Sequence, residues 1–313
     1  MKVRRAQEAD VPALVRLVNA AFLAEAPFVS GDRVDADEIR GRCASGLFLV
    51  AEDENGAFLG CVVLDTESTP GRFGLLAVSP EAQGRGLGRR LVALAEARLL
   101  AAGRTEVEIV VVSARRELLR FYETLGYAPV GTAPFPRPEK LKTPCHFVLM
   151  RRGLQPGAVR IGPGRDRGFV LTTGLLLPRP LAEVFAFFGD AANLDRITPP
   201  WLGFRILTPL PLDLREGALV DYALSLRGVP VRWRTEIVAW DPPRRFVDVQ
   251  KRGPYRAWRH EHLFTASEDG TFVEDRVEYE VLGGRLVHAL VVRGDLERVF
   301  RFRQERVRGL LGG

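Results

Sequence analysis

The sequence has few cysteines and no long apolar run, and each absence argues against a class of protein. Cys43, Cys61 and Cys145 stand far apart, and none belongs to a Cys-x-x-Cys pair. This spacing argues against a disulfide framework or a zinc site and fits a reduced compartment. No stretch approaches the roughly 20 apolar residues of a membrane span, and no apolar segment follows the basic residues at the start. We therefore expect a cytoplasmic protein without a membrane span.

The composition predicts a globular protein of two domains. The chain has 313 residues, of which 46% are hydrophobic and 27% charged. Basic and acidic residues balance over residues 1–150, so the net charge of +6 arises after them. Much of it lies in a terminal stretch with five arginines: Arg298, Arg301, Arg303, Arg306 and Arg308. We interpret these arginines as a solvated helix face rather than a nucleic-acid site, because no recognition motif accompanies them.

A glycine-rich loop is the strongest chemical signal in the chain. It consists of Gln83, Gly84, Arg85, Gly86, Leu87 and Gly88, between a strand-like run at 74–78 and a helix-like run at 90–97. Glycines remove the Cβ atoms that would keep a phosphate from the backbone, so that N–H groups can converge on it at the positive end of a helix. The loop is neither a GxGxxG fingerprint nor a P-loop. It predicts an anion site suited to a pyrophosphate.

Two motifs together give residues 1–152 a recognisable pattern. Residues 78–88 match Val-x-Pro-x-x-Gln/Arg-Gly-x-Gly-x-Gly, and residues 122–127 match Tyr-Glu-x-Leu-Gly-Phe/Tyr. On these motifs the segment resembles the GNAT N-acetyltransferases. The resemblance implies a mixed α/β sheet with flanking helices, and the strand-like runs 48–52 and 58–65 around Asn55-Gly56 predict one hairpin of it.

The resemblance also implies how acetyl-CoA binds between two splayed strands. The pantetheine arm would pair with the backbone of Leu76, Ala77 and Val78, as an added strand does. The pyrophosphate would take the N–H groups of residues 83–88, with Arg85 or Arg89 supplying positive charge. Tyr122 matches the proton donor of the family. We expect acetyl-CoA as co-substrate and no metal.

The general base is open at this point. Histone acetyltransferases of the superfamily carry a glutamate six residues before the signature valine, where this chain has Arg72, and Ser113 replaces a frequent asparagine. A histone-type mechanism is therefore in doubt. Ordered water is one alternative, and the others are Asp65, Glu67, Glu106, Glu108 and His146.

Residues 153–166 are rich in Gly, Pro and Arg and predict a linker to a second domain at 167–313. That domain resembles the SRPBCC (START/Bet v 1-like) superfamily on the segments 197–201, 233–237, 253–255 and 258–262. The resemblance implies a helix-grip fold: an antiparallel sheet wrapped on a long C-terminal helix, which the apolar stripe predicts from about residue 286 to 311. The superfamily's ligands are broad, so the fold names no substrate.

Strand alternation predicts a polar group inside this second domain. It places Trp258, His260 and His262 on one face, and a two-residue hairpin turn within 267–270 sets Asp275 and Tyr279 on the same face. With Trp233 they form the predicted wall of a ligand cavity. A structural His–Asp network, recognition of a polar ligand and catalysis are the alternatives. The spacing permits zinc, but nothing else supports it, and we expect no metal.

These observations predict an acetyl-CoA-dependent N-acetyltransferase, acting on a small-molecule amine or a protein amino group, fused to a domain that binds an apolar or amphipathic small molecule. One alternative is a sensor that binds acetyl-CoA without turnover. The other is a second enzymatic activity in the C-terminal domain. No nucleic-acid partner is expected.

Overall fold

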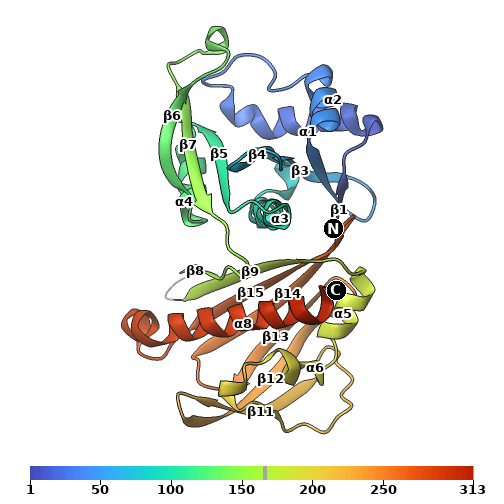
Figure 1. Cartoon of the computed structure of the whole chain (residues 1–313), viewed down its shortest axis with the longest axis vertical. Coiled ribbons are helices and arrows are strands. Elements are labelled where there is room, and N and C mark those ends of the chain that lie inside the picture. Colours follow the sequence, from blue (N-terminus) through green and yellow to red (C-terminus); the bar gives the residue numbers. More distant parts are fainter. Residues whose placement is uncertain (165–167, 313) are drawn as a thin grey trace. The chain divides into compact units, whose positions relative to one another are not determined.

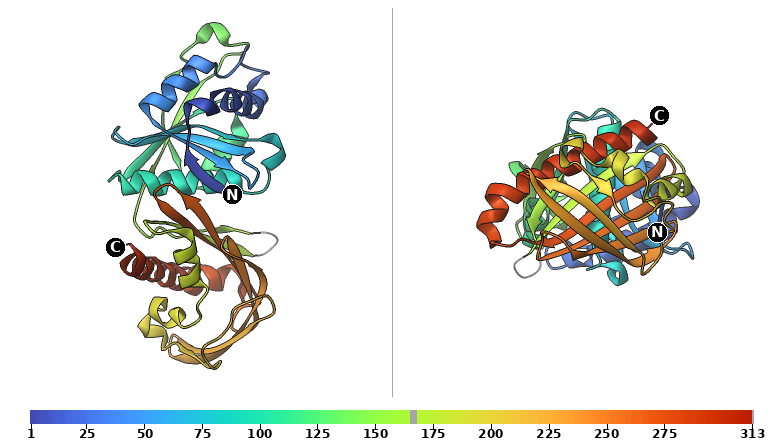
Figure 2. Two further views of the ribbon diagram at one scale, coloured as in Figure 1. Left: turned by 90° about the vertical axis from the view of Figure 1, so that its right-hand side faces the viewer. Right: turned by 90° about the horizontal axis from the view of Figure 1, so that it is seen from below.

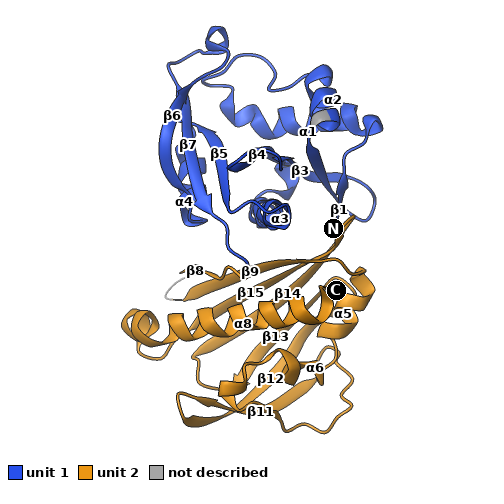
Figure 3. Cartoon of the chain, in the orientation of Figure 1, with its two compact units in different colours: residues 1–156 blue, residues 157–313 orange. Residues whose placement is uncertain are grey.

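The computed structural model describes residues 1–164 and 168–312. The chain forms two compact units, residues 1–156 and 157–313 (Figure 3). None of the described helices combines the length and apolarity that crossing a bilayer requires.

The first unit is a mixed sheet with helices on both faces (Figure 1). Its elements are β1 (Lys2–Arg5), α1 (Val11–Ala21), α2 (Ala36–Ser45), β2 (Leu47–Glu52), β3 (Phe58–Asp65), β4 (Gly71–Val78), α3 (Leu87–Ala101), β5 (Glu106–Val112), α4 (Arg116–Thr124), β6 (Ala128–Pro134) and β7 (His146–Gly153). The strand order is β1-β2-β3-β4-β5-β7-β6. The pairs are antiparallel except β4 with β5, which is parallel because α3 connects them. The predicted mixed α/β sheet is confirmed.

Local sequence signals fix several of these elements. The hairpin of β2 and β3 turns at Asn55-Gly56, and Gly56 has a φ of +81°, which a side chain at that position would disfavour. Gly103, with a φ of +79°, follows the end of α3. The amphipathic α1 buries Val11, Leu14 and Val18 against the sheet.

The second unit is an antiparallel sheet curved around one long helix. Its elements are β8 (Arg160–Pro163), β9 (Phe169–Leu177), α5 (Leu181–Phe188), α6 (Asn193–Ile197), β10 (Arg205–Ile206), β11 (Leu219–Leu226), β12 (Val229–Asp241), β13 (Arg245–Arg252), β14 (Ala257–Ser267), β15 (Gly270–Glu280), α7 (Gly284–Val287) and α8 (Arg293–Leu311). The strand order is β10-β11-β12-β13-β14-β15-β9-β8. Figure 2 shows α8 lying on the concave side of this sheet. The predicted helix-grip architecture is confirmed.

Two details differ from the sequence-based expectation. The terminal helical segment is not uniform, because a π-helical turn at His288–Val292 separates α7 from α8. Part of the predicted linker, residues 160–163, forms β8, which pairs with residues 169–172 because β9 offers it a free edge. Positions 165 and 166 of that linker lie outside the described residues.

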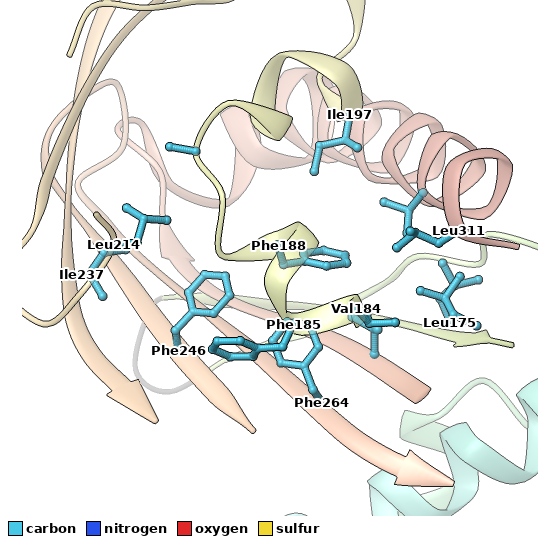
Figure 4. Close-up of a cluster of buried hydrophobic side chains, with 14 of the residues drawn as sticks. Leu175, Val184, Phe185, Phe188, Ile197, Leu214, Ile237, Phe246, Phe264 and Leu311 are labelled. Carbon is cyan, nitrogen blue, oxygen red and sulfur yellow. The ribbon is translucent and has the colours of Figure 1, made fainter. Parts of the chain in front are cut away.

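An aromatic core fills the space between α5 and the sheet of the second unit. Figure 4 shows Phe185 and Phe188 of α5 beside Phe246 and Phe264 of the strands. Phe185 and Phe264 pack edge to face, with ring centroids 5.2 Å apart, and so do Phe188 and Phe264 at 5.3 Å. Val307 and Leu311 of α8 belong to the same cluster. Phe188 and Phe246 of this apolar frame also pack against the ring of His262.

Candidate functional site

The strands β4 and β5 separate after a short paired stretch. Over the described residues they pair only at Gly71 with Val107 and at Arg72 with Glu108, although both strands continue beyond these two residue pairs. Among the described strands, none pairs with the backbone edge of β4 at Leu76, Ala77 and Val78 on the β5 side. On its other side β4 pairs with β3, with a bulge between Cys61 and Val63 and a φ of +44° at Leu75. A bulge of this kind turns a strand away from its neighbour, and it leaves an edge that an extended ligand can pair with.

The glycine loop follows the same strand. Gly84 and Gly86 have φ values of +74° and +82°, and a Cβ atom added to either would meet nothing within 4 Å. Arg90 N donates to Gly86 O at 3.2 Å, so the N–H groups of Leu87 and Gly88 precede the first helical hydrogen bond of α3. They are available to an external acceptor. The loop has the free N–H groups and the open space that a pyrophosphate needs.

Gln83 and two arginines lie at or beside the loop, and contacts with neighbouring residues hold Gln83 and Arg89 in place. Gln83 Nε2 donates to Val78 O at 3.1 Å, which ties the loop to the end of β4. The Arg89 guanidinium lies 5.4 Å from the Phe121 ring centroid and donates to Thr124 Oγ1 at 3.1 Å. Arg85 is exposed. These contacts hold a cation of α3 against α4 near the loop.

Tyr122 on α4 differs from Tyr127 in the use of its hydroxyl. Both rings are buried and 5.5 Å apart, and Phe73 packs against both. Tyr127 Oη donates to Glu96 Oε1 at 2.8 Å, which gives it a structural role. Among the hydrogen bonds of the described residues none involves the Tyr122 hydroxyl, and burial raises the pKa of Tyr122. Tyr122 is thus a protonated hydroxyl available to a ligand.

Two of the five candidate bases are engaged in structural contacts. Glu108 accepts from Arg151 at 2.9 Å and from Arg72 at 3.1 Å, and these hydrogen bonds, with that of Arg151 first, lower the pKa of Glu108. Asp65 accepts from the hydroxyl and backbone of Ser68, which lowers the pKa of Asp65. Both carboxylates are therefore poor proton acceptors near neutral pH. The other three candidates are solvent-exposed or nearly so: Glu67, Glu106 and His146.

A buried glutamate that the sequence reasoning missed lies beside a cavity of the same unit. Glu25 lines a hollow of about 190 Å³ together with Asn19, Phe22 and Arg33. Its exposed fraction is 6%, and burial raises the pKa of Glu25 above its ordinary value of 4.5 despite the nearby Arg33 and Arg115. A lone glutamate in a polar stretch carries no sequence signal, since only the folded chain buries it.

The second unit gathers its predicted residues on one inner face. His262 pairs with Asp275 and Trp258 with Tyr279 in the register of β14 and β15, around the expected turn at residues 267–270. Trp258 lies 5.4 Å from Trp233 and 5.9 Å from Tyr279, between ring centroids. The predicted juxtaposition of His262 and Asp275 is confirmed.

The two histidines lie between two aspartates. His260 Nε2 is 3.1 Å and His262 Nδ1 is 2.8 Å from Asp275 Oδ1. On the other side Asp248 Oδ2 is 3.7 Å from His260 Nδ1 and 3.4 Å from His262 Nε2. All four side chains are at most 14% exposed. The group is a compact, buried His–Asp cluster.

Opposing effects set the charges of this cluster. Burial and the neighbouring His262 lower the pKa of His260. Burial also opposes a charge on His262, but its contacts with Asp248 and Asp275 raise the pKa of His262. Burial likewise opposes a charge on Asp275, yet Arg303 and the two histidines hold the pKa of Asp275 well below its ordinary range. These effects favour a proton on His262 over one on His260.

Two residues of α8, Arg303 and Gln304, bring buried polar atoms that the sequence analysis did not predict. Arg303, expected on a solvated face, has a buried Nε atom for which the described residues provide no hydrogen-bond partner, and it acts electrostatically on Asp275. Gln304 is 3% exposed, and within the part of the chain that the structure describes neither of its side-chain amide atoms has a hydrogen-bond partner. The prediction of a solvated face was wrong for Arg303, because residues 303 and 304 lie on the same side of α8 as the buried Phe300 and Val307.

Two family models match separate stretches of the chain. Residues 44–129 match the family model of the acetyltransferase (GNAT) domain, and residues 177–308 match that of polyketide cyclase/dehydrase and lipid transport. The first unit thus contains a GNAT acetyltransferase domain, and the second contains an SRPBCC domain of the polyketide cyclase and lipid transport type. Both resemblances are confirmed.

Individual relatives match parts of this chain. Mycothiol acetyltransferase of Beutenbergia cavernae is 39% identical over 86 residues, which are 27% of this chain and 29% of the relative. That of Propionibacterium freudenreichii is 29% identical over 132 residues, 39% of this chain and 41% of the relative. The chain thus spans less than half the length of either. A GNAT superfamily phosphinothricin acetyltransferase from Sinorhizobium meliloti, solved with acetyl-CoA, has a TM-score of 0.41 and 20% identity, covering 49% of this chain and 88% of that one.

Proposed function

We propose that the first unit transfers the acetyl group of acetyl-CoA to an amine, either of a small molecule or of a protein. The observation that carries the proposal is the unpaired edge of β4 leading directly into the glycine loop. The backbone of Leu76, Ala77 and Val78 can pair with the pantetheine arm. The N–H groups of residues 84–88 can bind the pyrophosphate, with Arg85 and Arg89 supplying positive charge, while the N–H of Gln83 donates to Pro80 O at 3.4 Å.

The chemistry assigned to Tyr122 is hydrogen-bond donation rather than full proton transfer. A neutral amine attacks the thioester carbonyl and a thiolate leaves. A tyrosine of pKa about 10 would lose roughly 2 kcal/mol in protonating a thiolate of pKa about 8.5. Burial raises the pKa of Tyr122 and makes full transfer still less favourable. The hydroxyl therefore stabilises the growing thiolate, and the proton that the substrate nitrogen loses after its attack completes the exchange.

Glu25 is our candidate for receiving or holding the amine. Its carboxylate borders a cavity, and burial raises its pKa toward the range in which a general base works. The backbone around Val29, which also lines this cavity, is held to the segment before β7, since Ser30 N donates to Lys140 O at 2.8 Å and Lys142 N to Phe28 O at 2.9 Å. Asp65 and Glu108, by contrast, have pKa values lowered by their partners.

For the second unit we propose binding of an apolar or amphipathic small molecule with a polar end. The match to a lipid-transport family and the buried polar groups of α8 and the strands support this assignment. Buried polar atoms without partners cost about 1–3 kcal/mol each, a cost that a ligand would offset. Cyclase or hydrolase chemistry at this site is the alternative.

Release of coenzyme A thiol tests the transfer function directly. The full chain is incubated with acetyl-CoA and a panel of small amines and amino-terminal peptides, and free thiol is measured. Amine-dependent release supports the proposal. Retention of acetyl-CoA without release for any amine would contradict it and favour a sensor. Native mass spectrometry of the freshly purified protein would show a ligand of the second unit as an additional mass, and its consumption would indicate catalysis.

A further inference from the structure

The His–Asp cluster of the second unit has the arrangement of a metal site. Asp248 on β13 pairs with His260 on β14, and strand alternation puts His262 on the same face two residues on. The side-chain ligand atoms of these three residues lie within 4.8 Å of one another. They come from adjacent strands of one sheet, so the backbone holds them in place.

The distances fit a small coordination sphere. Asp248 Oδ2 is 3.4 Å from His262 Nε2 and 3.7 Å from His260 Nδ1. Ligand atoms about 2.0–2.1 Å from a tetrahedral ion are separated from one another by roughly 3.3–3.5 Å. The three donors therefore need only small movements to reach a common ion.

The other ring nitrogens face a second carboxylate. Histidines that bind a metal normally donate their remaining N–H to a carboxylate or a carbonyl, which fixes the tautomer and the ring. Asp275 Oδ1 occupies that position for both rings, at 3.1 Å from His260 Nε2 and 2.8 Å from His262 Nδ1. The His262 contact is close but lies outside the angular range of a directed hydrogen bond, so a slight turn of that ring accompanies binding.

The charge balance also favours a cation. Asp248 and Asp275 bring two negative charges into an apolar frame, and Arg303 supplies one positive charge nearby. With both imidazoles neutral, one negative charge remains, and a buried uncompensated charge is costly. A proton on His262 would compensate the same negative charge, so the experiment must distinguish metal binding from protonation.

We propose that Asp248, His260 and His262 bind one divalent transition-metal ion, with Asp275 orienting both imidazoles. Two imidazoles and one carboxylate suit Zn²⁺ or Fe²⁺ rather than Ca²⁺ or Mg²⁺. Three protein ligands leave a position open, where the polar oxygen of a ligand could bind. Asp248, the most exposed of the cluster at 14%, marks the side from which an ion enters.

Metal uptake by the full chain tests the proposal. The protein is treated with chelator, dialysed and titrated with Zn²⁺ by calorimetry and with Co²⁺ by visible absorption. We expect one equivalent per chain and a ligand-field band with Co²⁺. Asp248→Asn and His260→Gln should weaken Zn²⁺ binding by more than roughly 100-fold, and Asp275→Asn by roughly 10–100-fold.

His288→Gln is the matched control. His288 is a buried histidine of the same unit whose Nε2 lies 2.9 Å from the Tyr279 hydroxyl, and its replacement should leave Zn²⁺ affinity unchanged. Absence of stoichiometric uptake by the folded parent would overturn the proposal in favour of the proton-filled network. Equal affinity in His260→Gln and the parent would overturn it as well.

A second readout covers variants that fail to fold. The chain has four histidines, and imidazole nitrogen resonances of the parent report each of them during a Zn²⁺ titration. His260 and His262 should shift together while His146 and His288 do not. Shifts confined to His146 or His288 would place the ion elsewhere and contradict the site.

Discussion

His262 lies directly opposite Asp275 on the neighbouring strand, with 2.8 Å between Nδ1 and Oδ1 and both side chains at most 7% exposed. Strand pairing places the two side chains on one face, and the apolar frame of Phe246 and Phe188 excludes water around His262. Each of the two side chains therefore depends on the other to compensate its charge. Removal of either one leaves a buried charge without its partner.

This relationship predicts a large difference between neighbouring acidic residues. Asp275→Ala should lower the free energy of unfolding by about 3 kcal/mol, because His260 loses a hydrogen-bond partner and Arg303 and His262 lose a nearby negative charge. Glu274→Ala, on the half-buried outer face, should cost less than about 1 kcal/mol. Urea unfolding in the presence of chelator measures both values without a contribution from metal. Equal losses would mean that Asp275 is not a structural centre of the cluster.

Gly86→Ala should weaken acetyl-CoA binding at least tenfold. An added Cβ projects into the open space that the phosphate would occupy. Gly103→Ala is the control, because Gly103 also has a positive φ, of +79° against +82°, and open space around its Cβ position. Both variants should lose about 1–2 kcal/mol of stability from the left-handed conformation. Calorimetry that finds the same coenzyme affinity in both would refute the phosphate assignment.

Tyr122→Phe should lower kcat by roughly 10²-fold with little change in acetyl-CoA affinity, since its hydroxyl is proposed to act on charge that develops only during reaction. Tyr127→Phe is the comparison. It should lower stability by about 1–3 kcal/mol, because Glu96 loses a buried hydrogen bond. Steady-state kinetics with an identified acceptor amine decides the matter. An unchanged kcat in Tyr122→Phe would remove Tyr122 from the mechanism.

Glu25→Gln should stabilise the protein near neutral pH. Burial raises the pKa of Glu25 in the folded state, so folding is opposed as the pH rises above 4.5, the ordinary value that the unfolded chain retains. The gain of the variant should therefore disappear as the pH falls below 4.5. Glu117→Gln, which removes the other carboxylate on Arg115, should show no such gain, because the net shift of the Glu117 pKa is downward. Thermal unfolding of the three proteins between pH 4 and pH 8 measures the effect, and a pH-independent difference would contradict it.

Local sequence determined much of the fold and part of each candidate site. The Asn55-Gly56 turn, the glycine loop and the 267–270 hairpin depend on backbone conformations that a few residues dictate. Once a hairpin's register is fixed, alternation decides which side chains share a face, so the meeting of His262 with Asp275 followed from the sequence. The motifs at residues 78–88 and 122–127 likewise indicated the family of the first domain from the sequence alone.

Tertiary structure alone decided which polar groups are buried and which are paired. Glu25 has a raised pKa because the folded chain buries it, and Glu108 has a lowered pKa because Arg151 of β7 donates a hydrogen bond to it. Asp248 joins the histidines through pairing between β13 and β14, while α8 turns Arg303 inward. These contacts join residues far apart in the chain, and desolvation acts only on the folded ensemble. No local pattern therefore encodes the charge state of either site.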